Sequence, residues 1–123
     1  MTCPFCNLPA ERLLASDDLV FAILDKYPVT RGHTLVIPRR HVASYFDLTA
    51  GERLAIDGML KKAKDALDEE HHPQGYNIGI NIGCAAGQSI DHVHVHLIPR
   101  YEGDMKNPLG GVRGVIPGRQ SYP

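Results

Sequence analysis

The sequence predicts an α+β domain in which an antiparallel sheet of about five strands is covered by one long amphipathic helix. Short runs rich in Val, Ile and Leu alternate with turn residues, and one segment alone has the spacing of a long helix. The connections between the runs are too short for crossover helices, so consecutive strands must be antiparallel. With 123 residues, of which 43% are hydrophobic, the chain fits a single domain over residues 1–123.

The first strands are predicted in the N-terminal third of the chain, where apolar runs begin at Leu13. The clearest runs are Leu19 to Leu24 and Thr34 to Ile37, and Pro28 and Gly32 mark the loop between them. Both runs are rich in β-branched and aliphatic residues, as strands with buried faces require. We expect these two segments to be strands of the same sheet.

The long helix is predicted from about Ala50 to Glu70. Thr49-Ala50-Gly51-Glu52 has the pattern of a capping box, in which the Thr and Glu side chains satisfy the first free amides of a helix. Apolar residues then recur at helical spacing, at Ile56, Met59, Leu60, Ala63 and Leu67. His71 and His72 follow, and we assign them no chemistry, because positive charge at a helix C-terminus complements the helix dipole.

A hairpin is predicted after the helix. Tyr76 to Ile82 alternates as a strand does, Gly83 to Ser89 is a tight loop that contains glycine, and His92 to Ile98 alternates again. A strand has a period of two, so His92, His94 and His96 would lie on one face and the apolar residues between them on the other. The second strand of the hairpin therefore carries a row of imidazoles.

Three histidines on one strand face indicate a functional site. A solvated edge face would use Ser or Thr, which do not titrate near neutral pH, so a purely structural role is disfavoured. Two kinds of site remain open. All three imidazoles could bind one catalytic metal that keeps an open position. Alternatively, one imidazole attacks phosphorus while its neighbours bind phosphoryl oxygens and move protons.

The N-terminal pair Cys3-x-x-Cys6 has the spacing of two metal ligands, but a structural zinc needs four. Thioredoxin-like redox chemistry would place this motif after a strand at a helix N-terminus, a context that the sequence does not provide. If the Thr34–Ile37 and histidine strands are antiparallel neighbours, His41 lies beside His92, and both could complete the zinc site. By the same geometry His33 falls near His94 and His96, which would form a separate chemical site.

Charge and composition restrict the partners. The formal net charge of −1 provides no global field for nucleic acid or for an anionic membrane, so a negatively charged ligand must be bound locally. The backbone amides and the Gln88 amide of the Gly83–Ser89 loop could bind phosphate oxygens. The N-terminus has no signal-peptide pattern and no apolar stretch is long enough to span a membrane, so we expect a cytoplasmic protein.

The C-terminal segment, residues 103–123, is dense in Gly and Pro and has no clear periodicity. It contains Val112, Val115 and Ile116, which a disordered tail would leave without a packing role. We therefore predict an ordered arm. Arg113 could reach a distal phosphate of a substrate, although a surface arginine without a ligand is the simpler interpretation.

The combined pattern resembles the histidine triad (HIT) family of nucleotide hydrolases and transferases, of the zinc-containing prokaryotic type. The resemblance covers nearly the whole chain, and its most specific part is Gln88-Ser89 followed by His-x-His-x-His and two apolar residues. The other matching segments are Cys3-x-x-Cys6, Gly32 to Pro38, His41, Asn81, Gly87 and the run through Arg100.

The resemblance implies a homodimer built through an extended sheet, and cleavage at the α-phosphate of a nucleotide. His94 would be the nucleophile and would form a nucleotidyl-histidine intermediate, while His96 and His33 would orient the phosphate and share proton handling. Substrate contacts are implied for four further residues: the ribose hydroxyls for Asp25, the phosphate side for Asn81, and phosphate oxygens or the leaving group for Gln88 and Ser89.

The resemblance also implies a structural zinc held by Cys3, Cys6, His41 and His92, with residues 1–10 as the zinc-binding segment. These four positions agree with the ligands proposed above from strand order. The leading function is hydrolysis of dinucleoside polyphosphates, with adenine nucleotides favoured. Alternatives are hydrolysis of adenosine phosphoramidates or acyl-adenylates, phosphorolysis in which phosphate resolves the intermediate, and a nucleotide-binding regulatory role with incidental catalysis.

Overall fold

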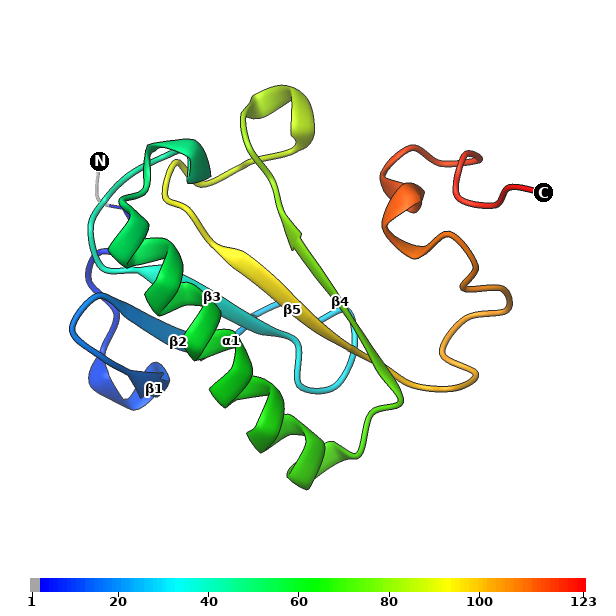
Figure 1. Ribbon diagram of the computed structural model, residues 1–123, viewed down its shortest axis with the longest axis horizontal. Coiled ribbons are helices and arrows are strands. Elements are labelled where there is room, and N and C mark those ends of the chain that lie inside the picture. The colour runs from blue at the N-terminus through cyan, green and yellow to red at the C-terminus, as the bar shows by residue number, and fades with distance from the viewer. Residues whose placement is uncertain (1–2) are drawn as a thin grey trace.

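Five antiparallel strands form one sheet in the order β1-β2-β3-β5-β4, and a single long helix, α1, crosses one face of it (Figure 1). This computed structural model describes residues 3–123; Met1 and Thr2, the start of the predicted zinc-binding segment, lie outside the described residues. The strands are β1 (Leu13–Ser16), β2 (Val20–Leu24), β3 (Thr34–Pro38), β4 (Gly75–Ile80) and β5 (Val95–Arg100). The predicted α+β class is confirmed.

Helix α1 (Ala50–His71) begins with the predicted capping box. The Thr49 hydroxyl accepts a hydrogen bond from the Glu52 amide at 3.0 Å, and the Glu52 carboxylate accepts one from the Thr49 amide at 2.9 Å. Arg40 donates two further hydrogen bonds to the same carboxylate. The start of the helix is thereby tied to the segment that follows β3. The helix ends at His71, and His72 adopts a left-handed conformation with φ of 54°.

The two faces of the sheet have separate cores. Between the sheet and α1 lies a cluster formed by Val20, Ala22, Val36, Val42, Leu48, Ile56, Met59, Val93 and Val95. A second cluster comprises Phe5, Phe21, Ile23, Leu35 and Ile37. Val93 and Val95 belong to the first cluster, whereas Phe5 of the second packs against the rings of His92 and His94. The predicted alternation of apolar and histidine faces is therefore present.

The histidine segment departs from the prediction in one respect, because β5 begins at Val95 and contains only the third histidine. The ladder between β3 and β5 ends at the pair Val36 and Val95. Beyond it, the Val93 amide donates to the Val42 carbonyl, and the His92 side chain donates to the Pro38 carbonyl at 2.7 Å. The segment before β5 therefore stays close to the segment after β3, but the hydrogen bond to the Pro38 carbonyl comes from the His92 side chain and not from the backbone.

Residues 3–123 also form four short 3₁₀ helices: η1 (Ala10–Arg12), η2 (Tyr45–Asp47), η3 (Cys84–Ala86) and η4 (Gly111–Val115). Strand β4 ends at Ile80, two residues earlier than predicted, and η3 lies in the loop between β4 and β5. These two strands pair as the predicted hairpin, from Gly75 with Arg100 to Ile80 with Val95. None of the helices among residues 3–123 is long and apolar enough to cross a membrane.

The C-terminal arm, residues 103–123, folds back on itself around Gln120 and lies beyond the edge strand β4 in Figure 1. Its Gly111 lies close to Asn77 of that strand. The Gln120 amide donates to the carbonyls of Asn107 and Leu109, and its backbone carbonyl accepts from Arg113. Gly110 has φ of +89°, and a Cβ there would overlap the Gln120 carbonyl oxygen, so this turn requires glycine. Packing was the reason to expect order, yet the arm's Val112, Val115 and Ile116 are exposed in the single chain.

Candidate functional site

The site lies where the first residues of β3 pair with β5. Leu35 pairs with His96 in the antiparallel register, and this register brings His33, two residues before Leu35, beside His96. His33 Nε2 lies 2.9 Å from His96 Nδ1. The rings of His94 and His96 are 5.3 Å apart between centroids. The predicted grouping of these three histidines is present.

The loop before β3 determines the orientation of His33. Gly32 has φ of +84°, and a Cβ there would approach the Leu67 side chain to 2.7 Å, so the turn into the strand requires glycine. The Val29 backbone amide lies 3.0 Å from His33 Nδ1. A backbone amide can only donate, so Nδ1 accepts and the neutral ring carries its proton on Nε2. His33 therefore donates to His96 Nδ1, which leaves the proton of His96 on Nε2.

His94 has the opposite arrangement. Its Nδ1 lies 2.8 Å from the backbone carbonyl of His92, and a carbonyl can only accept, so Nδ1 carries the proton. The lone pair is then on Nε2. The side chain is buried, with 8% of the residue exposed, and the Phe5 ring packs against it at 5.2 Å between centroids. In its neutral form, His94 thus presents the lone pair of Nε2 in a fixed orientation, as a nucleophile requires.

The ring of His92 points away from this group. Its Nε2 donates to the Pro38 carbonyl, so its lone pair is on Nδ1. His92 Nδ1 lies 3.5 Å from Cys3 Sγ, 3.7 Å from Cys6 Sγ and 3.3 Å from His41 Nδ1, and Cys6 Sγ lies 3.3 Å from His41 Nδ1. The four predicted metal ligands form one cluster.

The spacing of the cluster can be compared with that of a tetrahedral zinc site. Zinc–sulfur and zinc–nitrogen bonds of about 2.3 and 2.05 Å imply sulfur–nitrogen separations of about 3.6 Å and nitrogen–nitrogen separations of about 3.3 Å. The separations given above lie within about 0.3 Å of these values. Two cysteines and two histidines are also the donor types that zinc prefers in structural sites. The residues therefore fit a zinc ion with a closed coordination shell.

The alternative in which all three histidines bind one metal does not agree with this geometry, since only His92 has its lone pair in the cysteine cluster. A second group, Asp25, His33 and His96, has ligand atoms within 4.8 Å of one another. The Val29 amide keeps the proton of His33 on Nε2, which is the atom that would have to bind the metal. We therefore describe this second group as a hydrogen-bonded site and not as a metal site.

Burial favours the neutral form of three of these histidines at pH 7, namely His96, His33 and His92. It lowers the pKa of His96 to about 4, and the neighbouring rings of His94 and His33 add to the shift while the Asp25 carboxylate opposes it. Burial also lowers the pKa of His33, again opposed by Asp25, whose Oδ2 lies 3.4 Å from His33 Nε2. The pKa of His92 is lowered by burial as well.

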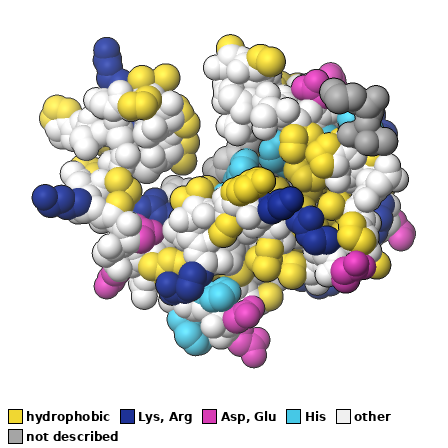
Figure 2. Space-filling model, turned by 180° about the vertical axis from the view of Figure 1, so that it is seen from behind, with side chains coloured by type: hydrophobic (Ala, Val, Ile, Leu, Met, Phe, Trp, Pro, Cys, Tyr) yellow, Lys and Arg dark blue, Asp and Glu magenta, His cyan; other side chains and the backbone are white. Residues whose placement is uncertain are grey.

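A cavity of about 480 Å³ adjoins these side chains. His33 and His96 line one side of it, together with the predicted substrate residue Asn81. Residues of the C-terminal arm line another side, namely Gly111, Val112, Gly114, Val115 and Gln120. Figure 2 views the face opposite α1 and shows histidine side chains near its centre, with a gap between the arm and the rest of the molecule.

Gln88 and Ser89 lie in the loop that precedes the histidines. The Gln88 amide nitrogen donates to the carbonyls of Ala43 and Ile90, and its oxygen accepts from the Gly83 amide. Both hydrogens of this side chain are used within the protein, so Gln88 shapes the loop here and offers no free donor to a phosphate. Ser89 is exposed.

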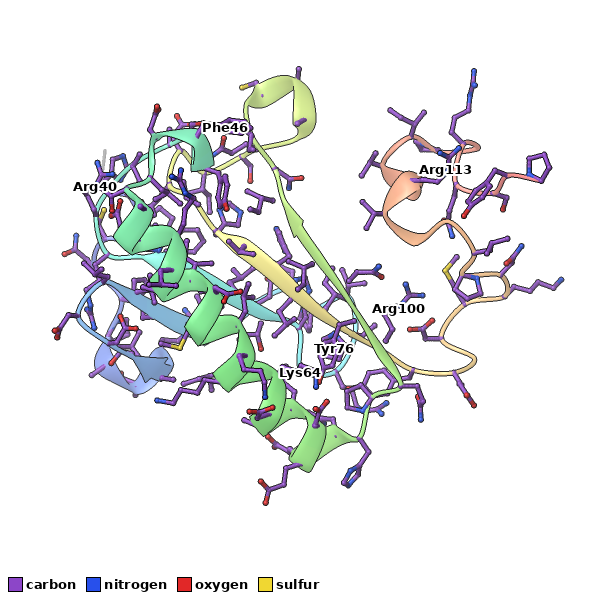
Figure 3. The ribbon with its side chains drawn as sticks, viewed as in Figure 1. Arg40, Phe46, Lys64, Tyr76, Arg100 and Arg113 are labelled. Carbon is purple, nitrogen blue, oxygen red and sulfur yellow. The ribbon has the colours of Figure 1, made fainter. Side chains whose placement is uncertain are left out.

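Several groups that build the site were not predicted. The Val29 amide and the Pro38 carbonyl belong to the backbone, so no residue type indicates them. Phe5 did offer a signal, because a large aromatic residue between the two cysteines of Cys3-x-x-Cys6 indicates a side chain that packs against other residues. Arg113, labelled in Figure 3, donates to Gln120 and stacks on Tyr122 within the arm, 4.8 Å from the ring centroid.

Comparison with known proteins supports the resemblance to the HIT family. The HIT domain family model matches residues 9–103. The AP-4-A phosphorylase of Mycobacterium tuberculosis is 39% identical over 122 residues, covering 93% of this chain and 62% of that protein. An uncharacterized HIT-like protein of Methanocaldococcus jannaschii is 39% identical over 107 residues, covering 83% of this chain and 81% of its own.

Among solved structures, a Zn-bound histidine triad family protein from Mycobacterium smegmatis is 36% identical, with a TM-score of 0.77. The similarity covers 86% of this chain and 80% of that one. The chain spans only about three fifths of the AP-4-A phosphorylase, so that protein's name describes a longer molecule. The family match and these identities show that the chain belongs to the HIT domain family.

Proposed function

We propose that this protein cleaves nucleotide phosphoanhydrides at the α-phosphate through a nucleotidyl-His94 intermediate, with dinucleoside polyphosphates as substrates and water as the acceptor. The observation that carries the proposal is the hydrogen bond from His94 Nδ1 to the His92 carbonyl. With the proton on Nδ1, the neutral form of this buried imidazole has its lone pair on Nε2. In-line attack by this nitrogen would replace one difficult displacement with two easier ones.

The surrounding residues would bind the substrate. His96 Nε2–H would donate to a nonbridging phosphate oxygen, where negative charge increases in the transition state. Asn81 lines the same cavity and would lie on the phosphate side. Asp25 would hold the ribose hydroxyls, and Ser89 would contact phosphate oxygens or the leaving group, while Gln88 maintains the loop that carries Ser89.

We assign zinc to the cluster of Cys3, Cys6, His41 and His92. The support is the tetrahedral spacing of the four donors and the Zn-bound relative described above. Bound there, zinc would cross-link the N-terminal segment to the segment that follows β3 and to the segment that precedes β5. It would have no open position for substrate, so its role would be structural.

A trapping experiment tests the intermediate. Diadenosine tetraphosphate labelled in its adenosine groups is mixed with excess protein, quenched, and the modified peptide is mapped by mass spectrometry. We expect the adenylyl group on His94 and none in a His94→Asn variant with an unchanged circular dichroism spectrum. A label on His92 or His96, or product formation without any label, would contradict the proposal.

Phosphorolysis is a second candidate because the 39% identical relative is named AP-4-A phosphorylase. With water as acceptor, asymmetric cleavage of diadenosine tetraphosphate yields AMP and ATP, whereas with inorganic phosphate it yields ADP and ATP. Chromatography of the products with and without phosphate separates the two. ADP as the main product at millimolar phosphate would replace hydrolysis by phosphorolysis in the proposal.

We also propose a homodimer that extends the sheet across β4. Strand β4 is at the edge of the sheet, and its Ile78 is 51% exposed. Leu54 of α1 and Phe46 of η2 are 73% and 75% exposed, and Phe46 is labelled in Figure 3. Light scattering should give twice the chain mass. Ile78→Glu should shift it to the monomer, whereas Leu14→Glu on the other edge strand should not.

A cytoplasmic location is the last part of the proposal. Cys3, Cys6 and Cys84 form no disulfide with one another, which is the usual state of cysteine in a reducing compartment. Fractionation of cells that carry the tagged full chain would place it, and recovery with the membranes would contradict the assignment.

A further inference from the structure

Two segments that are far apart in the sequence form walls of the cavity beside His33 and His96. One is the loop before β3, which contributes Val29 and His33, and the other is the C-terminal arm, which contributes Gly111 to Val115 in part, together with Gln120. Neither segment belongs to the sheet. The contacts that hold these two segments against the sheet therefore determine the shape of the cavity.

Tyr101, the residue after β5, is bound to the loop before β3. Its hydroxyl donates to the Arg31 carbonyl at 2.8 Å, and the Arg31 guanidinium lies over the Tyr101 ring, 4.2 Å from the centroid. Next to this contact, the Thr30 hydroxyl donates to the Pro99 carbonyl of β5 at 2.6 Å. The loop is thus held to the end of β5 at two successive residues.

These contacts lie within the turn that orients His33. The His33 backbone amide donates to the Thr30 carbonyl at 3.2 Å, and the Val29 amide donates to His33 Nδ1 at 3.0 Å. A loop that is held at Thr30 and Arg31 keeps the Val29 amide on the imidazole. The Tyr101 hydroxyl therefore supports the orientation of a ring that it does not touch.

Arg100, the last residue of β5, is bound to the arm. Its Nε and Nη2 donate to the two carboxylate oxygens of Asp104, each at 2.8 Å, and the Tyr101 amide donates to the same carboxylate at 3.0 Å. The side chains of Arg100 and Asp104 are only 22% and 17% exposed. A bidentate pair that is shielded in this way holds its geometry better than an ion pair on an open surface.

The same guanidinium is connected to the cavity through Asn77 of β4. Arg100 Nη1 donates to Asn77 Oδ1 at 2.6 Å, and Asn77 lines the cavity (Figure 3 labels Arg100). A Cβ on Gly111 would lie 3.2 Å from Asn77 Nδ2, so the backbone of the arm passes close to this amide. Gly111 is the first residue of η4, which forms the wall of the arm. Arg100 thus fixes both the start of the arm and the side chain against which η4 lies.

We propose that Arg100 and Tyr101 are positioning residues that hold the two walls of the cavity, Tyr101 the loop and Arg100 the arm. Neither side chain lines the cavity itself. Side chains alternate along an extended chain, so two consecutive residues at the end of β5 can serve different walls. The proposal rests on the proposed function in one respect, namely that the cavity receives part of a nucleotide.

The role of Tyr101 is tested without any ligand, by the imidazole ¹⁵N chemical shifts of the full chain at pH 8. In the wild type, His33 should show a proton on Nε2 and a lone pair on Nδ1. The double variant Tyr101→Phe, Thr30→Val removes both hydroxyl donors and keeps the ring and the side-chain volume. Its two His33 shifts should move toward each other, as a mixture of tautomers requires, whereas Arg100→Met should leave them unchanged. Unchanged His33 shifts in the double variant would overturn the role of Tyr101.

The role of Arg100 is tested by ligand binding and by proteolysis. Arg100→Met should raise the Kd of α,β-methylene ADP, which is not cleaved at the α-phosphate, by about tenfold, the amount that one hydrogen bond to a charged group is worth. Thermolysin should then cleave residues 103–123 faster. Asp104→Asn should act in the same direction, and Arg100→Lys should recover part of the affinity, because lysine keeps the charge but not the two parallel hydrogen bonds.

The matched control is Lys61→Met, which removes an exposed ion pair with Asp65 on α1 and should change neither Kd nor cleavage. A positioning role also predicts that Arg100→Met raises KM for diadenosine tetraphosphate while kcat stays within about twofold. An unchanged Kd together with an unchanged cleavage rate would overturn the role of Arg100. A lower kcat at constant KM would overturn it as well.

Failure of this proposal can be distinguished from failure of the proposed function. If the wild type does not bind α,β-methylene ADP, while the His33 shifts and the thermolysin cleavage change as expected, the nucleotide assignment fails and the two positioning roles stand. If the wild type binds the nucleotide and Arg100→Met binds it equally tightly although its arm is cleaved faster, the arm is no wall for the ligand. The role of Arg100 in binding is then wrong, and the proposed function stands.

Discussion

Removing the proposed zinc should lower the Tm of the protein, and activity should be lost only where the metal-free protein unfolds. The cluster links Cys6 to His41, which are 35 residues apart in the sequence, and His41 to His92, which are 51 apart. A cross-link that closes a loop of 35 residues restricts the unfolded chain by about 4 kcal/mol in the chain-entropy treatment. For a chain of this length, that corresponds to a decrease in Tm of about 15 °C.

The assay compares zinc content, thermal unfolding by circular dichroism and activity, with and without a chelator. Cys6→Ser should mimic the chelator, and Cys84→Ser is the matched control because Cys84 is an exposed thiol outside the cluster. Below its own Tm, the metal-free protein should retain activity, since the lone pair of His94 does not bind the metal. Immediate loss of activity with an unchanged Tm would refute the reasoning and would restore the metal-catalysed alternative.

Three further predictions concern stability. Arg40 lowers the pKa of Glu52 to about 2, so Glu52→Gln should cost about 1–2 kcal/mol in urea unfolding at pH 7. This stabilisation is present above pH 4.5 and is lost as the pH falls toward 2, so the wild type and the variant should converge there. Because the pKa of His96 is lowered in the folded protein, the unfolded chain binds more protons than the folded protein between pH 6.5 and 4. The free energy of unfolding should therefore decrease as the pH is lowered from 6.5 to 4, and it should decrease less in His96→Gln. Gly110→Ala should open the arm, because a Cβ would overlap the Gln120 carbonyl; limited proteolysis should then cut residues 103–123 faster, and a rate equal to that of the wild type would contradict this. Equal stability of the wild type and Glu52→Gln at pH 7, or a flat pH profile, would contradict the first two.

Sequence periodicity predicted the fold because this fold is made of local patterns. Three such patterns are the capping box at Thr49, the apolar spacing along α1 and the alternation around Val93. In each of them the residue type follows from the local environment of the side chain. The predicted contacts depended on the condition that the Thr34–Ile37 and histidine strands are antiparallel neighbours. The pairing of β3 with β5 meets that condition and brings His33 to His96 and His41 to His92. Strand limits were less accurate, because β5 begins only after the His92 side chain has taken the Pro38 carbonyl.

The position of the proton on each histidine ring could not be predicted, because it depends on backbone atoms that every residue type provides. Which ring nitrogen carries a proton depends on the Val29 amide and on the carbonyls of Pro38 and His92. Any residue at position 29 other than proline would provide the same amide, so the sequence carries no sign of it. Gln88 shows the opposite case, since its residue type indicated a phosphate ligand while its partners are within its own loop.

One peptide unit joins the two halves of the site. His92 presents its ring to the cysteines and its carbonyl oxygen to His94, so the cysteine–histidine cluster and the proposed nucleophile share a single backbone position. A shift of the His92 backbone would therefore change both the cysteine cluster and the orientation of His94, the proposed nucleophile. Substitutions near Cys3 and substitutions near His94 should consequently be non-additive in a double-mutant cycle, although the two groups belong to chemically separate sites.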